Sequence, residues 1–74
     1  MRAFQKVLID FDGLDDFIKI SLLMGYADLV YALQGAKRDM LYCHAKDARS
    51  FAVLVTYYDN NNQSIEIVPA TYLL

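Results

Sequence analysis

The spacing of hydrophobic and polar residues changes along the chain and divides it into strand-like and helix-like stretches. In residues 4–11 apolar and polar side chains alternate, which predicts a strand. Val7, Ile9 and Phe11 share one face of that strand. Asp12 follows at the point where its carboxylate can cap a helix. A strand that turns directly into a helix is therefore expected here.

Hydrophobic residues then recur with helical spacing from Leu14 to Leu33, with an interruption at Gly25. The pattern leaves open whether this stretch forms one bent helix or two. Gly35 can supply a left-handed cap that ends the helical stretch. Because apolar residues surround most of residues 20–33, we expect this segment at the centre of the core.

Beyond residue 38 the pattern predicts three strands, at residues 39–45, 50–58 and 64–68. They are joined by polar loops at residues 46–49 and 59–63, which are short enough for antiparallel hairpins. Residues 1–74 are thus expected to form a single small α+β domain. It has one N-terminal strand, a helical hairpin or bent helix, and then a three-stranded antiparallel meander.

Closing both hairpins tightly sets the register of this meander. Leu41 then lies opposite Leu54, and Tyr58 pairs with Ser64. One face of the sheet is strongly apolar and is expected to pack on the helices; it holds Met40, Tyr42, His44, Phe51, Val53, Val55, Tyr57, Ile65 and Ile67. The other face is mixed, and we expect a protein interface there, formed by Leu41, Leu54, Thr56, Tyr58 and Val68.

The apolar content is high for so short a chain. Of 74 residues, 57% are hydrophobic, whereas a domain of this size buries only about 60% of the surface that its unfolded chain exposes. Some apolar side chains are therefore expected to contact a protein partner or a second copy in a homo-oligomer.

The charge balance argues against nucleic acid as a partner. The net charge is −2, which opposes the attraction to phosphates on which nucleic-acid binding depends. Four basic residues are close in sequence, but a strand at residues 39–45 would hold the two pairs roughly 25 Å apart; they are Lys37, Arg38, Lys46 and Arg49. Residues 24–28 resemble the turn of a helix-turn-helix, yet residues 29–33 carry no side chain that reads bases.

Neither a membrane nor an oxidising compartment is indicated. Residues 20–36 are shorter than the ~20 apolar residues that span a bilayer, and Asp28 lies near their middle. Cys43 is the only cysteine, so no internal disulfide can form. The first residues do not follow the pattern of a signal peptide. A cytoplasmic protein without a membrane partner is expected.

Residues 7–13, Val-Leu-Ile-Asp-Phe-Asp-Gly, resemble the first motif of haloacid-dehalogenase-type phosphotransferases. The resemblance implies Asp10 as nucleophile, Asp12 as acid and base, and a Mg²⁺ site completed from later parallel strands. Leu14 stands where that family has a residue such as Thr, and the chain is too short for a doubly wound sheet. The aspartates are better explained as the end of a strand that leads into a helix.

The other chemical motifs also lack essential parts. Four aspartates form an acidic surface without the spacing of a calcium loop; they are Asp10, Asp12, Asp15 and Asp16. Cys43 and His44 are adjacent in a predicted strand, where their side chains point to opposite faces, so a buried Cys and a His at the core edge are expected. No catalytic residue, metal site or cofactor site is predicted.

The sequence therefore favours a non-enzymatic protein-binding module, such as a small inhibitor or adaptor, that self-associates. A viral or mobile-element accessory protein is the kind expected, because such chains are often short and acidic. The alternative is a small ligand-binding or enzymatic domain with a pocket between subunits, using Asp10, Asp12 or His44.

Overall fold

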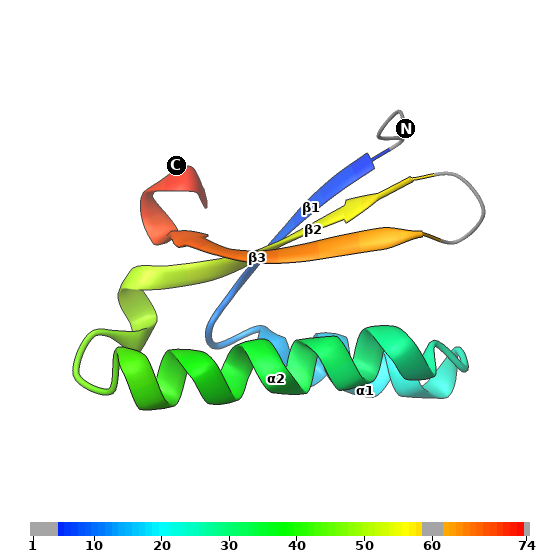
Figure 1. Cartoon of the computed structure of the whole chain (residues 1–74), viewed down its shortest axis with the longest axis horizontal. Helices are drawn as coiled ribbons and strands as arrows, with labels where there is room; N and C mark the ends of the chain where they lie inside the picture. The colour runs from blue at the N-terminus through cyan, green and yellow to red at the C-terminus, as the bar shows by residue number, and fades with distance from the viewer. Residues whose placement is uncertain (1–4, 59–61, 74) are drawn as a thin grey trace.

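A computed structural model of the chain describes residues 5–58 and 62–73. Figure 1 shows a three-stranded sheet with two antiparallel helices against one of its faces. The elements in chain order are β1 (Gln5–Asp10), α1 (Leu14–Leu23), α2 (Ala27–Cys43), η1 (Ala48–Ser50), β2 (Phe51–Tyr57), β3 (Gln63–Pro69) and η3 (Ala70–Leu73). Residue 4 of the predicted first strand and residues 59–61 of the predicted loop lie outside the described residues.

The sheet has the order β1-β2-β3, and both neighbouring pairs of strands are antiparallel. Leu8 pairs with Leu54 across β1 and β2, and Val55 pairs with Ile65 across β2 and β3. The predicted α+β class is confirmed, with an N-terminal strand, two helices and a three-stranded antiparallel sheet. The predicted strand at residues 39–45 is wrong, because β1 occupies that place beside β2.

Residues 39–43 are instead the last part of α2, which continues through Gly35. Leu33, Ala36 and Met40 are buried on one face at helical spacing. Packing of that face on the sheet favours helix over the cap expected at Gly35, so that prediction is wrong. Leu41 consequently lies on a helix and has no strand partner.

Gly25 separates α1 from α2 and settles the alternative that the pattern left open. Its φ is 81°, in the left-handed region that glycine adopts without steric cost. The amide of Gly25 donates to the carbonyl of Leu22, and the amide of Tyr26 donates to that of Ser21. The turn is thus closed by backbone hydrogen bonds, and the two helices fold back on each other.

The core lies between the helices and the inner face of the sheet. Its buried residues are Ile9, Leu14, Leu29, Leu33, Ala36, Met40, Val53 and Val55. The predicted inner faces of β2 and β3 are confirmed, and Val7 and Phe11 pack against the same cluster. The predicted pairing of Tyr58 with Ser64 is wrong: Thr56 pairs with Ser64, a shift of two residues that leaves each side chain on its predicted face. Tyr42 is exposed and not part of the core.

The outer face of the sheet is partly covered by η3. This short helix follows Pro69, which ends β3 as predicted, and it contacts β1 and β2. In Figure 1 it lies on the side of the sheet away from α1 and α2. Ala52 and Val68, which pair with each other on this face, are both buried. Both faces of the sheet thus contribute buried residues.

Candidate functional site

The interface predicted on the outer sheet face is not one exposed surface. Thr56 and Val68 are only 5% and 6% exposed, so they are enclosed within the chain itself. Leu54 and Tyr58 are half-buried. Leu41 is exposed but lies on α2, in the layer on the opposite side of the sheet. The structure therefore separates Leu41 from the other four residues and leaves little of them available to a partner.

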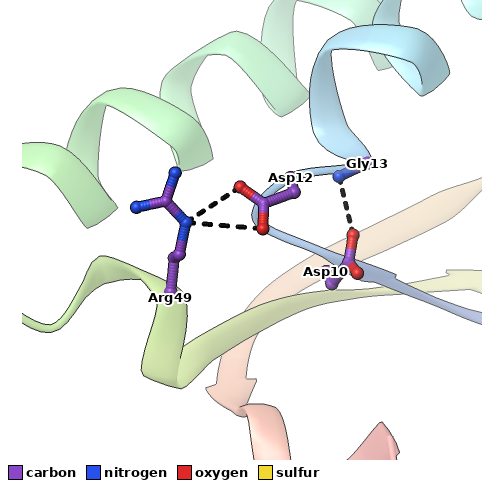
Figure 2. A network of polar contacts seen from close by, with 4 residues as sticks. All are labelled: Asp10, Asp12, Gly13 and Arg49. Carbon is purple, nitrogen blue, oxygen red and sulfur yellow. Dashed lines mark hydrogen bonds and ion pairs between the residues drawn. The ribbon is translucent and has the colours of Figure 1, made fainter.

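The acidic turn between β1 and α1 is organised by Asp10. Figure 2 shows its Oδ1 accepting a hydrogen bond of 2.6 Å from the amide of Gly13. A Cβ on Gly13 would lie 2.7 Å from that oxygen, so a side chain there would displace the carboxylate. Gly13 is the N-cap residue, and no side chain caps α1. The predicted capping by Asp12 is wrong, whereas Asp15 and Asp16 do lie in the first turn of α1.

Two of the four aspartates are paired with cations from distant parts of the chain. Asp12 accepts from the Nε of Arg49 in η1, at 3.0 and 3.4 Å (Figure 2). Asp15 forms an ion pair with Lys37 of α2. Both cations also lie within 6 Å of the Phe11 ring centroid, at 5.8 and 5.9 Å. This arrangement joins the turn to η1 and α2 and reduces the negative charge of the predicted acidic surface.

The chemistry implied by the phosphotransferase resemblance has no counterpart in the sheet. Both strand pairs are antiparallel, whereas that family places its remaining site residues on parallel strands. The carboxylates of Asp10 and Asp12 are engaged by Gly13 and Arg49. Within residues 5–58 and 62–73, no three His, Cys, Asp or Glu residues are grouped so as to hold a metal ion.

Cys43 and His44 lie at the end of α2. Cys43 is exposed, so the predicted burial of this thiol is wrong. His44 is half-buried and its ring stacks on that of Phe51, with centroids 4.0 Å apart and planes at 25°. The imidazole thus closes one edge of the core, as expected.

The exposed apolar surface lies on the helical layer. Among the described residues, eight of the nine strongly exposed large hydrophobic side chains belong to α1, α2 or the turn between them. We call this set the helical apolar surface; it consists of Ile20, Leu22, Leu23, Met24, Tyr26, Tyr31, Leu41 and Tyr42. Leu23 is 87% exposed. Residues 20–24 were expected in the core because apolar side chains surround the helix there, and for most of them this is wrong.

A cleft of about 490 Å³ opens between the turn joining the helices and the end of the β2–β3 pair. It is lined by Gly25, Tyr26, Ala27, Asp28, Leu29, Tyr57 and Gln63. Burial raises the pKa of the Tyr57 phenol above its ordinary value, and the nearby Tyr26 raises it further. None of the residues proposed for a pocket from the sequence lines this cleft.

Comparison with protein-family models, curated proteins and solved structures finds no match for this chain. In the part of the chain that the structure describes, neither helix is long and apolar enough to cross a membrane.

Proposed function

We propose that this protein is a non-enzymatic protein-binding module that acts in the cytoplasm and docks through the helical apolar surface. One observation carries the proposal: eight of the nine strongly exposed large hydrophobic residues described lie on one layer. The ninth, Tyr72, is in η3 on the other side of the sheet. Such concentration on one layer distinguishes a binding surface from apolar residues scattered singly.

The size of this surface supports the same conclusion. Large apolar side chains each present on the order of 200 Å², so eight residues at the observed exposures amount to roughly 1,000 Å². A standard protein interface covers about 800 Å² per partner, so the exposed apolar area of the two helices is enough to supply one. Three of the eight are tyrosines, a residue type enriched at interface centres.

The acidic turn and the thiol of Cys43 bear on how the protein binds and where it acts. The acidic turn is partly neutralised by Arg49 and Lys37, so binding is assigned to apolar contact rather than to imitation of nucleic-acid charge. Cys43 is free and exposed, and such a thiol persists most readily in the reducing cytoplasm.

Leu23→Asp tests the proposal, with Tyr72→Asp as the matched control. Both side chains are exposed, so both variants should keep the wild-type circular dichroism. We expect Leu23→Asp to abolish self-association or the capture of a specific protein by a tagged copy expressed in its native cell. Tyr72→Asp should retain both. Equal behaviour of the two variants would contradict binding through the helical apolar surface.

A small-ligand-binding domain is a second candidate, favoured by the cleft at Tyr26 and Tyr57. Its volume of about 490 Å³ lies within the range of roughly 300–1,000 Å³ that small-molecule sites occupy. A metabolite panel in a thermal-shift assay tests this candidate. A ligand that stabilises the wild type but not a Tyr26→Ala variant would support it.

A further inference from the structure

The outward side of α2 carries a stripe that is symmetric along the helix. Tyr31, Gly35, Arg38 and Tyr42 follow one another at intervals of four, three and four residues. At 100° per residue these four positions fall within an arc of about 60°. Tyr31 and Tyr42 are 78% and 83% exposed and stand about 16 Å apart along the helix axis. We call these four residues the α2 stripe.

Gly35 leaves the centre of the α2 stripe without a side chain, at the edge of a hollow between α2 and β3. Gly35 lies inside α2, and its φ is not in the positive range. A Cβ there would meet only the end of the Arg38 side chain, at an ordinary 3.7 Å. A glycine inside a helix lowers helix stability, so its presence is best explained by close approach of something from outside.

We propose that a second copy of this chain covers the stripe, with the two α2 helices antiparallel about a two-fold axis. This inference rests on the proposed function and names its partner. Tyr31 and Tyr42 are equidistant from the middle of the stripe, so the two-fold brings Tyr31 of each copy against Tyr42 of the other. Gly35 then faces Arg38 across the axis, where the absent side chain leaves room. An isologous interface needs this kind of self-complementary pattern.

Charge complementarity favours the same arrangement. The first turn of α2 carries Asp28, and Lys46 lies just beyond its C-terminal end. Antiparallel pairing brings opposite charges and opposite ends of the helix dipoles together. At their observed exposures, Tyr31 and Tyr42 present roughly 300 Å² of surface to this contact.

A second copy suits this layer better than a membrane does. Asp15 and Asp16 are exposed on α1 beside the same surface, and the chain carries a net charge of −2. Binding to anionic headgroups depends on clustered basic residues. A second copy presents both Asp28 and Lys46 and so matches the mixed charges of this layer.

A charge-pair exchange at the two tyrosines tests the proposal in the full chain. We expect light scattering after size exclusion to give the wild type twice the 8.5 kDa mass of one chain. Tyr31→Lys combined with Tyr42→Lys places like charges at both contacts and should raise the dissociation constant at least about tenfold. Tyr31→Lys combined with Tyr42→Glu places opposite charges at both contacts and should remain dimeric.

The outcomes separate the geometry from the proposed function. Dissociation of both double variants would indicate parallel pairing, in which each residue faces the same residue of the other copy. That outcome would overturn the proposal. A dimer that neither double variant weakens would also overturn it. So would a monomeric wild type. If the wild type is monomeric, a protein that it captures and that Leu23→Asp does not capture would still support the proposed function. Sedimentation of the wild type with phosphatidylcholine vesicles would instead assign the surface to a membrane. Circular dichroism of all variants, with Tyr72→Lys as control, checks the fold.

Discussion

Among single residues, Tyr57 links ionisation to folding. Its ring packs against the core, and burial is the main reason that its pKa is raised from the ordinary value of 10.0, with Tyr26 as the second cause. The folded protein therefore holds the phenolic proton more tightly than the unfolded chain does. Below about pH 9 both states are protonated and this contribution to stability is constant. Above that pH the unfolded chain ionises first, so stability falls until the raised pKa of the folded state is passed.

Tyr57→Phe should reduce this alkaline loss. We expect the free energy of unfolding of the wild type to fall more between about pH 9 and pH 11 than that of the variant. Urea titrations followed by circular dichroism measure the difference. Tyr72→Phe is the matched control, since Tyr72 is exposed and lies outside the proposed interface, so this variant should retain the wild-type slope. If Tyr57→Phe and the wild type lose stability in parallel, burial of Tyr57 has no influence on its ionisation.

Among the elements, α2 differs most from the sequence prediction, at its C-terminal end. Substitutions at two residues there distinguish the helix from the predicted strand. Both Met40 and Tyr42 would face the core from a strand, but in the helix Met40 is fully buried and Tyr42 is exposed. Met40→Ala should therefore destabilise the protein by about 2–5 kcal/mol. Tyr42→Ala should change the free energy of unfolding by no more than about 0.5 kcal/mol, apart from any effect on assembly. Chemical denaturation at low protein concentration measures both, and comparable losses would favour the strand.

The sequence did contain a signal for this helix. Residues 39–45 include no Val, Ile or Thr, and Tyr42 is their only residue of a type enriched in strands. Residues 36–41 are mostly strong helix formers. Leu29, Leu33, Ala36 and Met40 also continue one helical face across Gly35. Packing of that face outweighs the tendency of the single residue Gly35 to end a helix.

The sheet shows what a local pattern can and cannot predict. The inner faces of β1, β2 and β3 follow from alternation alone, and a register error of two residues did not change them. Alternation does not predict that β2 pairs with β1, because β1 lies more than forty residues earlier in the chain. No local signal distinguishes a distant strand from a neighbouring one.

The candidate surface was difficult to predict for a different reason. The apolar run at residues 20–24 has the composition of a buried segment. Which of its sides is covered depends on where the sheet lies, and the sheet is formed largely by residues beyond position 50. The ion pairs that Asp15 and Asp12 form with Lys37 and Arg49 could not be predicted, because they depend on the placement of α2 and η1 beside the turn.

In the whole molecule, coverage of the sheet on both sides determines where a partner can bind. The helices bury its inner face, and η3 lies over part of its outer face. Most of the strongly exposed large hydrophobic residues described belong to the helical layer. Association through that layer would place the two sheets on the outside of the assembly, where substitutions on their outer faces should not affect it.

Leu54→Lys and Val53→Lys test this two-sided arrangement. Val53 is fully buried on the inner face, so a lysine there would strand a charge in the core and unfold a domain of this size. Leu54 is half-buried on the outer face and pairs with Glu66 of β3, which can neutralise an introduced lysine. We expect Leu54→Lys to keep both the wild-type circular dichroism and the wild-type mass in light scattering. A folded Leu54→Lys that no longer associates would assign the interface to the outer sheet face and contradict binding through α1 and α2.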